Sequence, residues 1–240
     1  MLSPYGMEIV ESCLTCKLRA DRIFCDLPAS ALQTFEGIKY ATAYPQGAVL
    51  FVEGQMPRGI FVLCKGSVKL SINSPNGRTM IVKLAEPGEV LGLSATISGK
   101  PYEVTAETLD PCQVNFVKRD DFLRFLKDDV EACFKVAEQL SDKYHTACQE
   151  VRTLGLSHSA AEKLANLLLE WSCKNDESAK AEPRLKLRLT HEEIAQMIGT
   201  SRETVTRLFA EMKRRQIVRS KGSTLLIRNT AALREIANHN

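Results

Sequence analysis

The chain has 240 residues, of which 44% are hydrophobic and 25% charged, and its formal net charge at pH 7 is only +3. This length and apolar content can bury one large core or two modest ones. An apolar run of about 18 residues, as needed for a membrane-spanning helix, does not occur, and the N-terminus lacks the pattern of a secretory signal. We therefore expect a cytoplasmic protein with no membrane partner, whose eight Cys form no structural disulfides.

Residues 1–30 form a Cys-containing N-terminal segment. Cys13, Cys16 and Cys25 follow the spacing C-x2-C-x8-C. Thiolates two residues apart commonly bind iron–sulfur clusters or zinc, and such a pair can also cycle between thiol and disulfide. The alternative is that these Cys are small core residues without a cofactor.

Residues 31–120 are predicted to form a β-roll that serves as a sensor domain. The segments VLFVEG, GIFVLCKGSVKLSI, MIVKLAEPGEVLGL and CQVNFV are rich in β-branched and aromatic residues, and glycines punctuate them. Short strands at regular spacing with glycine turns are typical of a small barrel or roll. Cys64 falls within the strand FVLCKG, and we expect it in the core.

Residues 121–156 are predicted to form a dimerisation helix. Apolar residues recur there at alternating spacings of three and four, as in a helix–helix seam. The stripe consists of Val130, Cys133, Ala137, Leu140, Tyr144, Ala147, Val151 and Leu154. Packing of this helix on its own domain is the alternative, and we favour a homodimer.

Residues 157–240 are predicted to form a winged helix-turn-helix that binds DNA. Thr190 and Glu193 have the spacing of a capping box and should start one helix. Gly199 should end that helix, and Thr200 or Ser201 should cap the next. The segment after the second helix has the pattern of a small β-hairpin, which would be the wing.

The second helix of this segment combines an apolar face with a basic one. From residue 201 to residue 228 there are eight Lys or Arg and two Glu, a local charge of +6 that exceeds the charge of the whole chain. Arg can bind guanine edges, Glu can accept from cytosine, and further cations can neutralise phosphates. The candidate DNA contacts are Ser201, Arg202, Glu203, Thr206, Arg207, Lys213, Arg214 and Lys221.

The segment GTSRETVTRLFAEMKRRQIV resembles the recognition helix of the Crp/Fnr family of bacterial transcription regulators. The strings G-x(11)-G-S-V, N-G-R and P-G-E-V-L-G resemble the cyclic-nucleotide-binding roll of the same family. This resemblance implies an α+β fold: a roll, a long dimerisation helix and a C-terminal winged helix-turn-helix. It also implies a homodimer on double-stranded DNA that contacts RNA polymerase and activates or represses promoters.

In that family, the positions of Glu203 and Arg207 read bases of a TTGA- or TGTGA-type half-site. Arg202 corresponds to a further base- or phosphate-contacting Arg. The family resemblance implies no enzymatic activity, and the chain contains no catalytic motif such as a P-loop or G-x-S-x-G.

Cyclic AMP is not the expected effector, because two of its binding positions differ. The cyclic-AMP branch has a Glu where this chain has Leu93, and an Arg-Ser pair near the positions of Tyr102 and Glu103. A buried cyclic phosphate needs a cationic partner, and Glu103 would repel it.

The Cys resemble those of the Fnr branch, where three N-terminal Cys and one downstream Cys hold an oxygen-labile 4Fe–4S cluster. Cys112, in E-T-x-x-x-C, matches the downstream ligand. The resemblance implies a cluster on Cys13, Cys16, Cys25 and Cys112, although the family spacing is C-x2-C-x5-C and Cys25 lies three residues later. The alternatives are zinc on these Cys, thiol oxidation or a small-molecule ligand in the roll.

Overall fold

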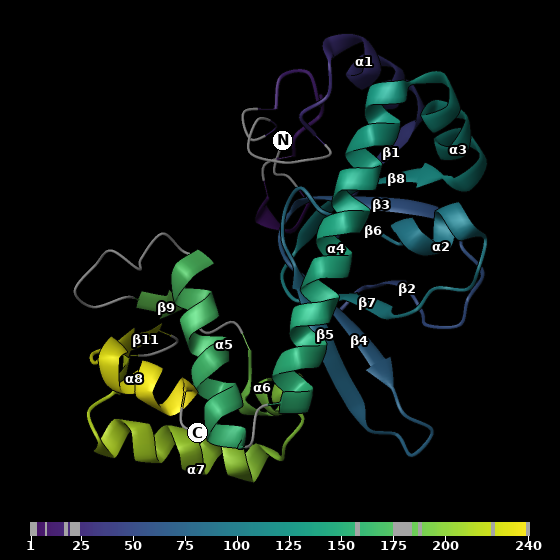
Figure 1. Cartoon of the computed structure of the whole chain (residues 1–240). Coiled ribbons are helices and arrows are strands. Elements are labelled where there is room, and N and C mark those ends of the chain that lie inside the picture. The colour runs from purple at the N-terminus through teal and green to yellow at the C-terminus, as the bar shows by residue number, and fades with distance from the viewer. Residues whose placement is uncertain are drawn as a thin grey trace. The chain divides into compact units, whose positions relative to one another are not determined.

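The structure is a computed structural model that describes residues 4–7, 9–16, 19, 25–156, 159–174, 184–186, 189–221 and 224–238. The chain divides into two compact units, Met1–Thr146 and Ala147–Asn240, and each is described by itself (Figure 1). The boundary between the two units lies within a long helix. The sequence analysis places a segment boundary between residues 156 and 157, at the end of the predicted dimerisation helix. Among the described helices, none has the length and apolar character needed to cross a membrane.

The first unit contains two four-stranded antiparallel sheets, as expected for a roll of short strands. The first sheet has the order β1 (Lys39–Tyr44), β8 (Cys112–Lys118), β3 (Gly59–Lys65) and β6 (Val90–Leu91). The second has the order β2 (Val49–Phe51), β7 (Thr105–Thr108), β4 (Val68–Asn73) and β5 (Thr79–Ala85). A short helix, η1 (Pro4–Gly6), precedes them in the chain.

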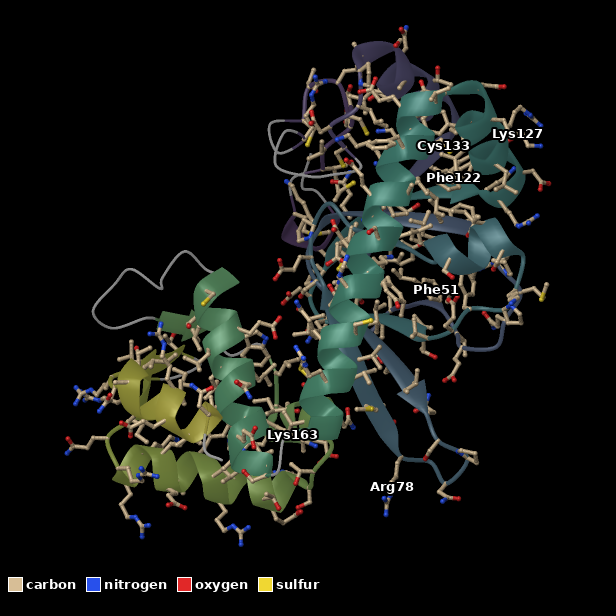
Figure 2. All side chains as sticks on the ribbon, in the orientation of Figure 1. Phe51, Arg78, Phe122, Lys127, Cys133 and Lys163 are labelled. Atoms are coloured by element: carbon tan, nitrogen blue, oxygen red, sulfur yellow. The ribbon has the colours of Figure 1, made fainter. Side chains whose placement is uncertain are left out.

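Two hydrophobic cores lie on opposite faces of the first sheet. The inter-sheet core lies between the two sheets and includes Phe51, Leu63 and Val114. The helical core lies on the other face, where β3 and β8 pack against α1 (Ala29–Ile38), α3 (Arg119–Asp128) and the start of α4 (Val130–Leu156). Figure 2 labels Phe51 of the inter-sheet core and Phe122 of the helical core. Strands β3, β6 and β8 therefore present alternate side chains to two different cores.

The predicted dimerisation segment contains two helices rather than one. Helix α3 ends at Asp128, and α4 begins at Val130, where the apolar stripe also begins. Asp129 lies between them, and its carboxylate accepts a hydrogen bond from the Ala132 N–H at 2.8 Å. An Asp at this position caps the N-terminus of the second helix and separates it from the first.

Besides the end of α4, the described residues of the second unit form four helices and a small antiparallel sheet. The helices are α5 (Ala160–Lys174), α6 (His191–Ile198), α7 (Arg202–Arg214) and α8 (Thr230–Ala237), and the sheet has the order β10 (Val218–Lys221), β11 (Thr224–Ile227) and β9 (Arg184–Lys186). Leu164, Leu168 and Leu225 are fully buried within this unit. The sequence analysis predicted neither α8 nor α2 (Leu93–Ser98) of the first unit.

Candidate DNA-binding surface and cysteine pocket

Helix α6 begins at the predicted capping box. The Thr190 hydroxyl accepts the Glu193 N–H at 3.2 Å, and the Glu193 carboxylate accepts the Thr190 N–H at 2.9 Å. Gly199 ends the helix with a φ of +66°, which a residue without a side chain adopts at little cost. The start and the end of α6 therefore confirm the prediction.

Helix α7 follows at once and has the predicted two faces. Ser201 caps it, with its hydroxyl accepting the Thr204 N–H at 3.2 Å. Val205, Phe209 and Met212 are buried on one side. The opposite side exposes predicted contact residues, namely Arg202, Glu203, Thr206, Arg207, Lys213 and Arg214. The turn and helix therefore place these side chains where a DNA duplex could reach them.

His191 supports one of these contact residues from α6. Its Nδ1 lies 2.9 Å from the Thr206 hydroxyl, and its ring stacks on Phe209 with centroids 5.1 Å apart. The Thr206 hydroxyl also donates to the Arg202 carbonyl at 2.9 Å. Burial lowers the pKa of His191, and the nearby charges of Lys213 and Arg202 lower it further. The His191 imidazole thus contacts the Thr206 side chain on the exposed face and helps to hold it in place.

A β-hairpin follows α7 at the predicted position of the wing. Strands β10 and β11 pair from Val218 opposite Ile227 to Lys221 opposite Thr224. Arg219 is exposed on β10. The backbone of Lys221 lies in this strand, and its side chain falls outside the described residues.

Three of the four predicted cluster ligands line one pocket. Cys13, Cys16 and Cys25 border one pocket next to the helical core. Its other lining residues are Val10, Arg19, Leu32, Phe35, Val62, Cys64 and Asn115. Cys25 lies in a turn four residues before α1 begins, so the longer x8 spacing still brings it to the other two.

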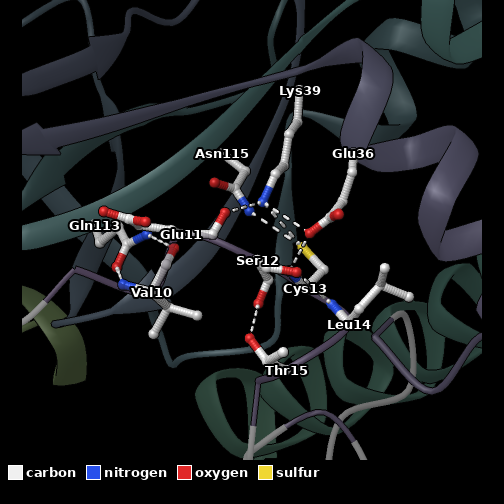
Figure 3. A network of polar contacts seen from close by, with 10 residues as sticks. All are labelled: Val10, Glu11, Ser12, Cys13, Leu14, Thr15, Glu36, Lys39, Gln113 and Asn115. Atoms are coloured by element: carbon white, nitrogen blue, oxygen red, sulfur yellow. Dashed lines mark hydrogen bonds and ion pairs between the residues drawn. The ribbon is translucent and has the colours of Figure 1, made fainter.

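Cys13, which lines this pocket, is held in a polar network (Figure 3). Lys39 approaches its sulfur with Nζ at 3.3 Å, and the Asn115 side-chain amide donates to the same sulfur at 3.7 Å. The Cys13 N–H donates to Glu36 at 2.5 Å. Burial raises the pKa of the Cys13 thiol, and Lys39 opposes that rise. The network thus fixes one thiol beside a cation that can stabilise its anionic form.

Cys112, the fourth predicted ligand, does not join the other three. It is fully buried in the inter-sheet core, where its thiol donates to the carbonyls of Asp110 at 3.1 Å and Ser67 at 3.3 Å. Burial raises the pKa of Cys112 to about 11. Because side chains alternate along β8, Cys112 and Val114 face the inter-sheet core. Asn115 and Val117 face the opposite side, toward the pocket and the helical core.

Cys64 lies at the pocket instead of in the core, contrary to the sequence expectation. It is half-buried on β3 and lines the pocket beside Val62. No group of three or more His, Cys, Asp or Glu side chains in the described part of the chain is arranged to hold a metal ion as it stands. The remaining Cys are exposed on helices, namely Cys133, Cys148 and Cys173.

The positions that distinguish the roll from a cyclic-AMP site are filled by the protein's own contacts. Leu93 is buried in the helical core. The Tyr102 hydroxyl donates to the Gly59 carbonyl at 2.8 Å, and its ring stacks on Phe51 at 4.1 Å. Glu103 accepts a hydrogen bond from Ser94 at 2.7 Å. None of these three contributes a cation for a phosphate.

Much of the predicted stripe on α4 faces away from the protomer's own core. Val130, Tyr144 and Val151 are 84%, 70% and 71% exposed. Cys133, Ala137 and Ala147 are also exposed, whereas Leu140 is half-buried against the helical core. The Leu154 side chain lies outside the described residues. The helix packs on its own unit through Ala132 and Val136 instead.

Two protein-family profiles match this chain. The profile of the cyclic nucleotide-binding domain matches residues 41–129. The profile of the Crp-like helix-turn-helix domain matches residues 162–236. Together they cover the roll and the DNA-binding surface described above.

Curated relatives and solved structures of similar sequence and fold span most of the chain. The nitrogen fixation regulation protein FixK of Bradyrhizobium diazoefficiens is 26% identical over 89% of this chain and 87% of its own length. A CRP-like cAMP-activated global transcriptional regulator of Mycobacterium tuberculosis is 24% identical over 88% of this chain and 94% of its own. The structure of FixK2 from Bradyrhizobium japonicum has a TM-score of 0.72 at 22% identity, covering 85% of this chain and 99% of that one.

Proposed function

Because this chain is a DNA-binding transcription regulator of the Crp/Fnr family, we propose that it acts as a homodimer on a pseudo-palindromic site under redox control. The observation that carries the DNA-binding part is α7, whose capped start presents a run of exposed polar side chains. Its position after a tight turn matches the way a helix-turn-helix reads the major groove. Such a protein acts in the cytoplasm, where its DNA target lies.

We propose that Arg202, Glu203, Thr206 and Arg207 select the bases of a TTGA- or TGTGA-type half-site. Arg suits the O6 and N7 atoms of guanine, and Glu suits the amino group of cytosine. Lys213, Arg214 and Lys221 would hold phosphates and contribute affinity without sequence choice.

The homodimer rests on the exposed stripe of α4. Large apolar side chains such as Val130, Tyr144 and Val151 are exposed on one side of this helix, and pairing with a second copy would remove them from water. A two-fold dimer would place two copies of α7 about one DNA turn apart. Bound in this way, the regulator would contact RNA polymerase and activate or repress promoters.

We propose that the signal is redox state or oxygen, received by thiolates of the N-terminal segment. Cys13, Cys16 and Cys25 at one pocket suit a thiolate-bound iron–sulfur cluster, which supplies sensitivity to oxygen when bound. Zinc on the same thiols or oxidation of the Cys13–Cys16 pair are the alternatives, and metal and sulfide analysis of the anaerobic protein distinguishes them. Cys112 is poorly placed to complete the set, because it lies in the inter-sheet core.

We infer that cyclic AMP does not control this protein. Leu93 is buried in the helical core and Glu103 places a negative charge near the expected phosphate position. Adding cyclic AMP should therefore leave the affinity for DNA unchanged. A rise in affinity on adding it would return the roll to the role of nucleotide sensor.

Selection from a randomised duplex library, with the protein kept reduced and free of oxygen, tests the DNA-binding proposal. The enriched sequences should form a pseudo-palindrome whose half-sites lie about one turn, or 10 base pairs, apart. Enrichment of unrelated sequences would contradict it. Repeating the binding after exposure to air tests the redox part separately, since unchanged affinity would remove redox control and leave DNA binding intact.

A further inference from the structure

We propose that Cys64, rather than Cys112, supplies the fourth thiolate of the N-terminal site, together with Cys13, Cys16 and Cys25. The inference deepens the proposed function, because it rests on the N-terminal thiolates binding a soft metal centre. It assigns to the centre a ligand from a central strand of the roll, in addition to the three from the N-terminal segment.

The local structure of β3 directs Cys64 to the pocket. Leu63 pairs with Val114 and Lys65 with Gln113, so that Cys64 is the extra residue of a β-bulge. Cys64 lies two residues after Val62, and the alternation of side chains along the strand sends both to the pocket, whereas Leu63 faces the inter-sheet core. Cys64 therefore lines the same pocket as the N-terminal thiols, on a strand whose backbone position is fixed by its neighbours.

Cys112 has no room to take that place. The Cys112 sulfur packs directly against the backbone of Gly66, where a Cβ atom would lie only 2.5 Å from the sulfur. Gly66 itself has a φ of +87°. Both hydrogen bonds of the thiol point to the carbonyls of Ser67 and Asp110. Bringing this sulfur to the pocket would require β8 to turn its inner face outward, which would disrupt its pairing with β1 and β3.

Asn115 links the pocket to Cys13. Its side chain is 1% exposed and lines the pocket, and its amide donates to the Cys13 sulfur at 3.7 Å. An N–H donor at this sulfur stabilises its thiolate form.

The charges around the pocket suit a thiolate centre. Four thiolates around a zinc ion or a 4Fe–4S cluster leave a net charge of about −2. Arg19 lines the pocket, and Lys39, whose side chain is only 7% exposed, approaches the Cys13 sulfur at 3.3 Å while also pairing with Glu36 at 3.7 Å. A buried negative centre needs such cations. No carboxylate or imidazole stands among the described residues that line the pocket, which favours a soft ion over a hard one.

A centre at this position would be coupled to the dimerisation helix. Leu32, Phe35 and Val62 line the pocket and belong to the helical core, which also contains Ala132 and Val136 of α4. Strand β3 also pairs with β6, where the Val90 carbonyl accepts a hydrogen bond from Lys143 of α4 at 2.7 Å. Binding of the centre to Cys64 would therefore order the surface on which α4 packs.

The test compares Cys64→Ala and Cys112→Ala in the full chain, with Cys13→Ala as the positive control and Cys173→Ala as the matched control on an exposed helix. Each protein is reconstituted without oxygen from ferrous iron and sulfide, and iron and sulfide per chain are measured. A parallel titration with Co²⁺ alone follows thiolate-to-metal absorption. Cys64→Ala should lose the cluster as Cys13→Ala does, and should weaken Co²⁺ binding at least about tenfold, whereas Cys112→Ala and Cys173→Ala should match the parent.

The outcomes separate this inference from the proposed function. Loss of metal in Cys112→Ala with retention in Cys64→Ala would overturn the role of Cys64 and leave the cluster proposal standing. The parent protein could instead take up no iron or sulfide but bind Co²⁺ in a way that depends on Cys64. That result would support Cys64 as a metal ligand and overturn the iron–sulfur cluster proposal. A parent that binds neither would overturn both.

A footprint on the unsubstituted chain covers the case in which a variant fails to fold. The protein is alkylated with and without bound Co²⁺ or iron, and the modified Cys are identified by mass spectrometry. Cys64 should be protected only when metal is bound, whereas the buried Cys112 should be protected in both states. Equal labelling of Cys64 in both states would overturn the inference.

Discussion

Glu203 is exposed in the first turn of α7, one residue after the helix begins. In a helix-turn-helix, the N-terminal residues of this second helix contact base edges in the major groove. Replacing Glu203 by Ala removes a carboxylate that accepts from cytosine, and should therefore relax base choice at one position at a cost of about 1–3 kcal/mol. Fluorescence anisotropy on a panel of half-site variants measures this. Glu211→Ala, exposed at the far end of the same helix, is the control and should keep the parental base preference. An unchanged preference in Glu203→Ala would remove the assignment.

His191 gives the DNA-binding unit a dependence on pH. Its pKa is lowered in the folded chain by burial and by Lys213 and Arg202, so the unfolded chain takes up a proton more readily. The contribution of His191 to the free energy of unfolding is therefore fully present above the ordinary His pKa. It is lost as the pH falls toward and through the lowered pKa of the folded chain. His191→Gln should lose part of this acid sensitivity, seen as a smaller fall in Tm between neutral and acidic pH. His145→Gln, exposed on α4, should behave as the parent does.

At the scale of elements, the stripe on α4 predicts how the protein associates. Tyr144 is 70% exposed on that stripe, and an Asp in its place would put a charge into the proposed seam. Tyr144→Asp should shift the protein from dimer to monomer in analytical ultracentrifugation. Gln149→Asp puts the same charge on an exposed position away from the seam and should leave the dimer intact. Equal association of the two variants would mean that α4 does not form the interface.

Lys143 connects α4 to the first sheet by a hydrogen bond, and its lowered pKa should make the free energy of unfolding depend on pH in the alkaline range. It donates to the Val90 carbonyl, and burial lowers its pKa from 10.5 to about 8. Between these values the unfolded chain holds the proton more tightly, so stability should rise as the pH increases from 8 to 10.5. Lys143→Met should remove that rise in denaturant titrations, whereas Lys127→Met, at an exposed position of α3, should retain it. A rise that persists in Lys143→Met would assign it to other groups.

Local signals in the sequence were sufficient for the helix-turn-helix. The capping box of Thr190 and Glu193, the stop at Gly199 and the cap at Ser201 each depend on residues within one turn, and the structure has all three. Asp129 also had a local signal, since its side chain caps α4, but the break between α3 and α4 was not predicted.

The position of the Cys depends instead on contacts that are distant in sequence. Val62 and Cys64 share one face of β3 by strand alternation, and the pairing of β3 with β8, about 50 residues later in the chain, places that face at the pocket. Cys112 looked like a ligand by its neighbours, but the alternation of β8 directs it to the inter-sheet core. Spacing alone does not reveal such strand registers, which is why the sequence grouped Cys112 with the three N-terminal Cys, whereas the structure places Cys112 in a different core.

At the scale of the whole molecule, the chain combines a roll, a helix with an exposed apolar stripe and a winged helix-turn-helix. This combination matches the two family profiles. In the function we propose, the cysteine pocket would receive the signal, α4 would pair the subunits and α7 would select bases. DNA affinity should therefore depend on both half-sites at once. It should also depend on the Lys and Arg residues at the end of α7 and in the wing.

The most direct test measures affinity for two duplexes by anisotropy, with the protein reduced and free of oxygen. One duplex has two selected half-sites one turn apart, and the other has the same half-sites separated by about five more base pairs, half a turn. We predict tight binding to the first that weakens steeply with salt, and at least about tenfold weaker binding to the second, which turns one half-site away from its helix. Equal affinity for both duplexes at every salt concentration would contradict a regulator that reads DNA as a two-fold dimer.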